Sequence, residues 1–169
     1  MKALPEGLRL VVAGRFGHAD QARRSRDLAK GGNVTFIEDP DEATLAGLYR
    51  AACVFVRASG APDPAGGPPA APEFTCRPAM RALASGACVL ASDAGCLPEI
   101  ASGGSFARVF HDDDELVRGL ADVLSRAWPP AGAGDLARAR ATSVFGLDAF
   151  GVRLARFYGD VAARRRGAA

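Results

Sequence analysis

The most informative segment of the chain is Ala82-Leu-Ala-Ser-Gly-Ala-Cys-Val-Leu-Ala-Ser-Asp-Ala-Gly-Cys-Leu-Pro-Glu-Ile100. It begins inside a helix predicted over Pro78–Ser85, and Gly86 is the residue type that commonly follows a helix. Ala87–Ala91 is uniformly apolar, which is typical of a strand buried on both faces. A short helix is predicted over Leu97–Ser102, because a proline and a glutamate fall in its first turn. The segment therefore predicts one helix–strand–helix unit of a parallel sheet.

The sequence on either side continues this alternation of strands and helices. Further strands are predicted over Leu8–Ala13, Val34–Ile37, Cys53–Val56 and Phe106–Phe110. Further helices are predicted over Gln21–Lys30, from Asp39 to Tyr49, from Asp112 to Leu124 and over residues 146–163, as a C-terminal helical tail. We therefore expect an α/β fold, a Rossmann-like three-layer α/β/α arrangement with a parallel sheet of about five strands.

The length and charge of the chain indicate a single soluble domain. It has 169 residues, of which 21 are basic and 19 acidic, giving a net charge of +2. The length suits one domain over residues 1–169, and the balanced charge gives no reason to expect nucleic acid as a partner. No stretch of about 18 apolar residues lacks charges, so no membrane span is expected. Met1–Leu10 has no apolar signal core, so we expect a cytoplasmic protein.

Neither the cysteines nor the histidines form a recognisable metal-binding pattern. No two of the four cysteines are spaced C-x-x-C, and His18 and His111 are far apart in the sequence. We therefore predict no metal site, reduced thiols, and two histidines that are polar loop residues rather than catalysts.

Two segments depart from the regular alternation. Residues 60–72 consist of Gly, Ala and Pro with one Asp, a composition that predicts a long flexible loop. The tail carries an apolar stripe at helical spacing, which we interpret as a surface that docks the tail on the domain. The stripe consists of Phe150, Leu154, Phe157, Tyr158 and Val161.

Ligands of open parallel sheets bind beyond the carboxyl ends of the strands, so candidate site residues are sought there. Gly14 and Arg15 follow the first strand, where an arginine can contact an anion. Residues 74–77 precede a helix whose unpaired amides suit a phosphate, and Glu73 beside them can accept sugar hydroxyls. Gly95 permits close backbone approach after the fourth strand. Each pattern also occurs in ordinary strand-to-helix turns.

Taken in order, these segments resemble the C-terminal, donor-binding domain of the retaining GT-B glycosyltransferases of the large group 1 family. The matching segments are Leu10–Gly14, Asn33–Phe36, Leu48–Val56, Ala82–Ile100, Asp114–Leu116 and Phe157-Tyr158. The resemblance covers nearly the whole chain. It implies binding of a nucleotide sugar and hexosyl transfer with retention. It implies no cofactor and no metal, because amides and arginines would meet the phosphate charge.

The resemblance also assigns site residues. The family carries Glu-x7-Glu at this helix start, and the first glutamate, associated with the donor sugar, falls on Glu73 as the implied catalytic residue. The second, associated with the ribose, falls on Arg81, which cannot accept a hydrogen bond from a hydroxyl but can pair with a phosphate. Glu38 would lie near the base, mainly through its backbone. The implied donor-binding residues are Gly14, Arg15, Glu38, Thr75, Cys76, Arg77, Arg81 and Gly95.

Two features of the family have no counterpart in the sequence. The family's acceptor domain is absent, and so are the first strand and helix of the donor domain. That strand is central in the order 3-2-1-4-5-6, and closing the gap predicts the order 2-1-3-4-5. Cys96 also replaces a glycine where the sugar would lie.

Two functions therefore stay open. In the first, the chain is the donor-binding part of a glycosyltransferase that transfers sugar only with an acceptor-domain protein. In the second, it is a non-catalytic binding or assembly module that keeps the fold, with a homo-oligomer as one form. A phosphate-binding flavodoxin-like domain of unrelated function is a third alternative.

Overall fold

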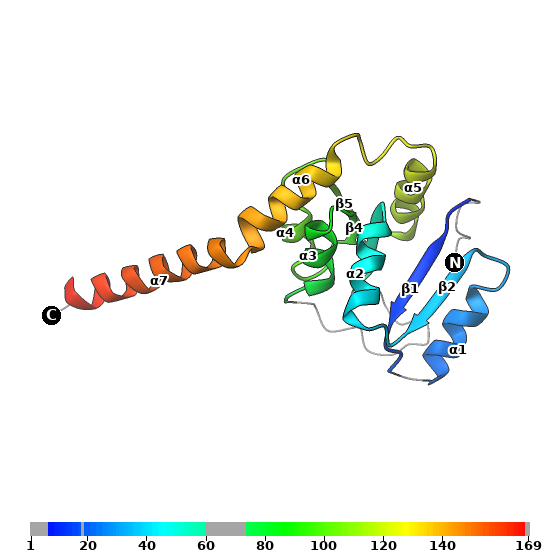
Figure 1. Cartoon of the computed structure of the whole chain (residues 1–169), viewed down its shortest axis with the longest axis horizontal. Coiled ribbons are helices and arrows are strands. Elements are labelled where there is room, and N and C mark those ends of the chain that lie inside the picture. The colour runs from blue at the N-terminus through cyan, green and yellow to red at the C-terminus, as the bar shows by residue number, and fades with distance from the viewer. Residues whose placement is uncertain (1–6, 18, 60–73, 168–169) are drawn as a thin grey trace.

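A computed structural model describes residues 7–17, 19–59 and 74–167 of the chain. The predicted loop over residues 60–72, Glu73 and His18 therefore lie outside the described residues. The strands are β1 (Leu10–Gly14), β2 (Val34–Glu38), β3 (Val54–Arg57), β4 (Cys88–Ser92) and β5 (Ala107–Phe110). The helices are α1 (Ala19–Leu28), α2 (Glu42–Ala51), α3 (Arg77–Ala84), α4 (Leu97–Ala101), α5 (Asp113–Leu124), α6 (Ala133–Arg140) and α7 (Leu147–Gly167), with a π-helical turn, η1, over Ala141–Phe145 (Figure 1).

The α/β fold is confirmed, and the described strands alternate with helices along the chain. All strand pairs are parallel: β1 pairs with β2, β3 with β4, and β4 with β5. Local sequence explains several helix starts. Asp41 caps α2 by accepting from the Thr44 amide, and Asp112 caps α5 by accepting from the Glu115 amide, both at 2.7 Å.

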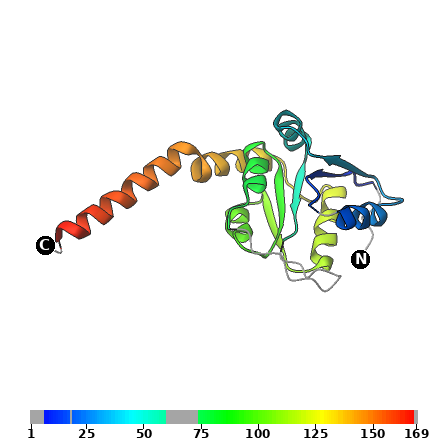
Figure 2. The ribbon, with the colours of Figure 1, turned by 90° about the horizontal axis from the view of Figure 1, so that it is seen from below.

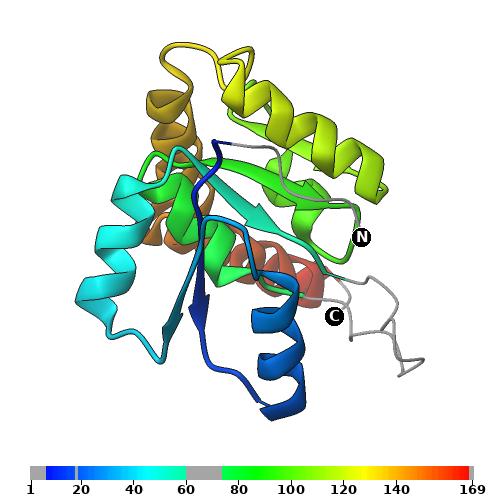
Figure 3. The same cartoon turned by 90° about the vertical axis from the view of Figure 1, so that its right-hand side faces the viewer.

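The prediction of one sheet in the order 2-1-3-4-5 is wrong because β1 does not pair with β3. The strands form a two-stranded sheet, β1-β2, and a separate three-stranded sheet, β3-β4-β5. Figure 3 shows the two-stranded sheet at an angle to the larger one. The position of a strand depends on the helices packed around it as well as on the order of the strands. In the structure α2 packs against α3, and Tyr49 of α2 contacts Phe55 with ring centroids 5.9 Å apart, which holds β3 beside β4.

The core lies around β4, the middle strand of the larger sheet. All of its residues are buried, whereas those of β1 and β3 are half-buried or exposed. Side chains from α3, α4 and the segment before α6 complete this core. The largest fully buried ones are Leu83, Leu90, Leu97, Ile100, Val89, Cys76 and Cys88.

The prediction that the C-terminal tail docks on the domain is also wrong. Helix α7 extends away from the body of the molecule in two perpendicular views (Figures 1 and 2). Every side chain described from residue 150 to residue 166 is exposed. The apolar stripe exists as predicted, but the described part of the body does not cover it.

Candidate functional site

The end of β1 and the end of β2 meet in an arginine–carboxylate pair. The Asp39 amide donates to the Gly14 carbonyl, and the guanidinium of Arg15 lies 3.1 Å from the Asp39 carboxylate. Both side chains are more than half exposed. An exposed pair of this kind contributes little to stability. Arg15 is therefore available to a phosphate only in competition with Asp39.

Glu38 is paired in the same way, and the pair forms one wall of a surface hollow. Its carboxylate accepts from the Arg26 guanidinium at 3.2 Å. The guanidinium also lies 5.3 Å from the ring centre of Phe16 and 5.9 Å from that of Phe36. These distances are within the range of cation–π contacts. Phe16, Arg26 and Glu38 line an open hollow of about 540 Å³ over α1 and β2. Glu38 was predicted to lie near the base of a nucleotide, and it lies beside an aromatic ring and a guanidinium group.

The start of α3 presents the predicted phosphate-binding segment. Thr75 and Arg77 are exposed there, and Pro78 stands in the first turn of the helix. The first turn of a helix has amides without intrahelical partners, which favours an anion. Cys76 is fully buried, so the exposed surface of this segment comes from its neighbours Thr75 and Arg77.

Arg81, one turn further along α3, is already paired. Its guanidinium lies 3.1 Å from the carboxylate of Glu42 on α2. Arg81 stands at the position that the resemblance assigns to the ribose, and here it joins helices α2 and α3. A donor phosphate at Arg81 would have to displace Glu42.

The loop after β4 is tied to the loop after β3. The Ser92 hydroxyl accepts from the Ser59 amide and donates to the Ser59 carbonyl, both at 2.9 Å. Gly95 follows with a φ of +57°, a conformation that glycine adopts without strain. Gly95 and the start of α3 lie beside the larger sheet. Gly14, Arg15 and Glu38 lie at the ends of the strands of the smaller sheet. The structure therefore divides the predicted donor-binding residues between two sheets.

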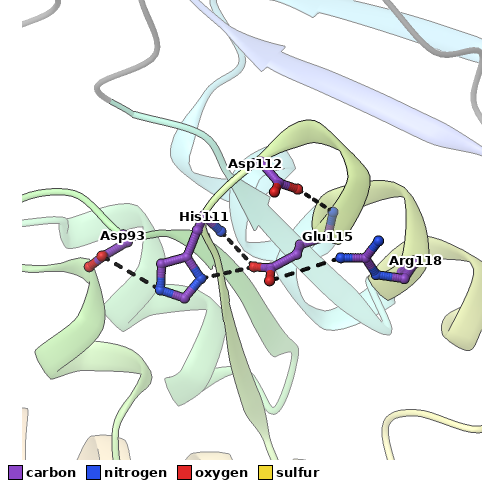
Figure 4. A network of polar contacts seen from close by, with 5 residues as sticks. All are labelled: Asp93, His111, Asp112, Glu115 and Arg118. Carbon is purple, nitrogen blue, oxygen red and sulfur yellow. Dashed lines mark hydrogen bonds and ion pairs between the residues drawn. The ribbon is translucent and has the colours of Figure 1, made fainter.

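A polar network at the end of β5 was not foreseen (Figure 4). The imidazole Nδ1 of His111 lies 2.9 Å from the Glu115 carboxylate, which also accepts from the His111 amide at 2.8 Å. The imidazole Nε2 lies 3.6 Å from the carboxylate of Asp93, which follows β4. The hydrogen bond and charge of Glu115 raise the pKa of His111, and the hydrogen bonds from His111 lower the pKa of Glu115.

The pH range of this stabilisation follows from the two directions. A raised histidine pKa stabilises the fold below the ordinary value of 6.5, and the effect is lost as the pH rises through the raised pKa. A lowered glutamate pKa stabilises above the ordinary value of 4.5, and the effect is lost as the pH falls. The pair therefore stabilises most between these two values. Because the groups are exposed, salt screens the effect.

Substitution of Glu115 by Gln is expected to lower the pKa of His111, since the anionic acceptor is removed. Proton NMR of the imidazole between pH 4 and pH 9 measures it directly. Asp113→Asn removes a neighbouring acid of the same helical turn and should change the His111 pKa less. Equal changes in the two variants would show that the general acidity of the turn, not the Glu115 contact, governs His111.

The sequence contained one usable signal for this network. His111 and Glu115 are four residues apart across a helix start, a spacing at which side chains meet. The contact with Asp93 has no local signal, because it joins the ends of two different strands. Within the described residues, no group of three or more His, Cys, Asp or Glu side chains is arranged to hold a metal ion. No described helix is long and apolar enough to cross a membrane.

Comparison with known proteins supports a glycosyltransferase fold. No protein-family model matches the chain, and no curated protein sequence matches it. Among solved structures, sucrose-phosphate synthase from Thermosynechococcus elongatus matches 92% of this chain at 24% identity, with a TM-score of 0.68. HepE from Anabaena, in complex with UDP, matches 93% at 19% identity, with a TM-score of 0.73. AviGT4, a glycosyltransferase involved in avilamycin A biosynthesis, matches 93% at 24% identity, with a TM-score of 0.65.

The chain thus has the fold of part of a glycosyltransferase. The resemblance to the C-terminal domain of the GT-B enzymes is confirmed at the level of the fold. The matched part is 39% of the sucrose-phosphate synthase chain, 42% of HepE and 44% of AviGT4, so this chain spans about two fifths of their length. HepE has also been solved with UDP-glucose, and that structure gives a TM-score of 0.72.

Proposed function

We propose that the chain is a donor-binding domain that holds the diphosphate of a nucleotide sugar at the start of α3. The observation that carries the proposal is the exposure of Thr75 and Arg77 there, beside helix amides that favour an anion. A fold shared with HepE, which is known in complexes with UDP and UDP-glucose, supports the choice of ligand.

The remaining site residues have roles consistent with this ligand. Arg15 meets phosphate by exchanging its Asp39 partner, and Glu38 lies near the base beside the hollow that contains Phe16. Glu73 orients the sugar and is the proposed catalytic residue of a retaining hexosyl transfer. Transfer requires donor and acceptor in near-attack geometry, which can contribute about 7–11 kcal/mol to lowering the barrier. The acceptor side is supplied by another domain or polypeptide.

The pairing of Arg81 with Glu42 favours a second function. A position that contacts the ribose in the family here joins α2 to α3, and both partners lie on described helices. A non-catalytic module that keeps the fold would retain such a link. The two functions differ in whether a nucleotide sugar binds at all.

Isothermal titration calorimetry with UDP- and GDP-sugars, with and without Mg²⁺, tests the proposal. We expect binding of at least one nucleotide sugar without Mg²⁺. Glu73→Ala is expected to weaken binding roughly 10- to 100-fold, the loss of one charge-assisted hydrogen bond of about 1.5–3 kcal/mol.

Glu99→Ala is the matched control. Glu99 is an exposed acid in the first turn of α4, where it complements the helix dipole, so its loss should leave binding nearly unchanged. Small, equal effects from both substitutions would place the sugar elsewhere. Absence of binding by every donor would favour the non-catalytic module.

A further inference from the structure

Helix α7 leaves a long apolar surface in solvent. Its exposed fractions include 84% for Leu147, 52% for Phe150, 40% for Leu154, 61% for Phe157 and 41% for Val161. Apolar side chains gathered in this number on one exposed helix mark an interaction surface. The helix extends from the body in both perpendicular views, so its apolar side is accessible along its length (Figures 1 and 2).

Burial of its apolar side would stabilise the helix. In proteins, most of the stability of a helix comes from packing of its apolar side rather than from intrinsic propensity. Gly151 and Gly159 lie in its interior, and each costs about 1 kcal/mol relative to alanine. Neither position requires glycine for lack of space, because a Cβ at either would meet nothing within 4 Å. Burial of the apolar side is therefore the available source of stability.

The spacing of the apolar residues identifies the kind of partner. Leu147, Phe150, Leu154, Phe157 and Val161 follow one another at alternating intervals of three and four residues. That alternation is the seam of a coiled coil, in which a second helix carries a matching seam. Because the seam from Leu147 to Val161 spans about 21 Å of helix, the matching partner is a helix of at least that length. Another copy of α7 meets both requirements.

Charges beside the seam select the direction of the second helix. With two copies antiparallel, Leu154 lies opposite Phe157 of the other copy and Phe150 opposite Val161. Arg153 and Asp160 then flank the seam on the same side and face each other across the pair, twice by symmetry. Arg164 continues the seam spacing. With two copies parallel it would therefore lie against Arg164 of the other copy, which places like charges together. The antiparallel pair instead places Arg164 opposite Leu147 at the end of the seam, next to Asp148 of the other copy.

We propose that the chain forms a homodimer through an antiparallel coiled coil of two α7 helices, with Leu147, Phe150, Leu154, Phe157 and Val161 in the seam. This dimer does not depend on nucleotide-sugar binding. It carries the two domains at opposite ends of the helix pair, because each α7 leaves its own domain at Leu147.

Sedimentation equilibrium of the purified 169-residue chain over a range of concentrations tests the dimer. Phe157→Lys places a charge in the seam and is expected to weaken dimerisation by at least about 100-fold, since a buried unpaired charge is strongly unfavourable. Val152→Lys is the matched control, because Val152 is 71% exposed on the same helix but lies off the seam. It should leave the dimer intact. Circular dichroism checks that the domain of each variant is folded.

A charge reversal tests the antiparallel direction. Asp160→Arg is expected to weaken the dimer by placing a second guanidinium against Arg153 of the other copy, and Arg153→Asp added to it should restore dimerisation. In a parallel pair Arg153 does not face residue 160, so the second change would not rescue the first. The proposal is overturned if the chain is a monomer at every concentration, including the case in which the monomer sediments with phosphatidylserine vesicles because a membrane surface covers α7 instead. It is also overturned if Phe157→Lys leaves the dimer unaltered, or if Arg153→Asp fails to restore the dimer of Asp160→Arg.

Discussion

Substitution of Trp128 by alanine is expected to lower the free energy of unfolding by about 3–5 kcal/mol, the usual cost of removing a large buried aromatic side chain. Trp128 is only 3% exposed, although it lies in the connection between α5 and α6. Its indole Nε1 donates to the Ser105 carbonyl at 2.8 Å, and the Arg108 guanidinium lies 4.9 Å from its ring centre. Chemical denaturation followed by circular dichroism measures the change.

Trp128→Phe separates the two contributions of the indole. Phenylalanine keeps an aromatic ring in the core but has no donor for the Ser105 carbonyl. Because Ser105 is exposed, water can replace the lost hydrogen bond. A loss of about 1–2 kcal/mol is expected, well below that of the alanine variant. Comparable losses in both would show that the hydrogen bond, rather than burial, carries the effect.

Local chemistry was sufficient to predict most elements of the fold. The apolar run ending before Ser92 was predicted as a strand over Ala87–Ala91 and is β4, one residue later. Asp112 before an acidic run predicted the start of α5, and the structure shows its carboxylate capping that helix. In both cases the determining interactions lie within a few residues, where spacing and residue type carry the information.

Contacts between distant elements could not be predicted in the same way. The stripe along α7 was recognised from its spacing, but spacing shows which side of a helix is apolar and not what covers it. The separation of β1 from β3 has the same origin. Strand order was inferred by deleting one strand, whereas the positions of strands also depend on helices such as α2, which packs against α3.

The candidate site shows this limit at the level of single residues. Arg15 and Arg81 were predicted to contact phosphate, and each is paired with a carboxylate far away in the sequence, Asp39 and Glu42. Residue type indicated the charge, but only the fold shows its partner. The proposed binding of a nucleotide sugar would therefore include the cost of breaking these exposed pairs, which is small for each.

Substitution of Leu90 by alanine is expected to destabilise the domain by about 3–5 kcal/mol, because it removes a large side chain from the centre of the larger sheet. Leu90 is 1% exposed, and its neighbours in register are Val56 on β3 and Arg108 on β5. Helix α5 approaches closely here, since a Cβ added to Gly119 would lie 3.0 Å from Leu90 Cδ2. A glycine has no side chain with which to fill the space that alanine leaves.

The same substitution at Leu136 provides the control. Leu136 is 52% exposed on α6, and alanine is a better helix former than leucine, so Leu136→Ala should change the free energy of unfolding by less than about 1 kcal/mol. Both variants lose the same atoms, so the difference between them measures burial apart from the small gain in helix propensity at Leu136. Parallel urea titrations give the two values, and equal losses would mean that the core is not centred on β4.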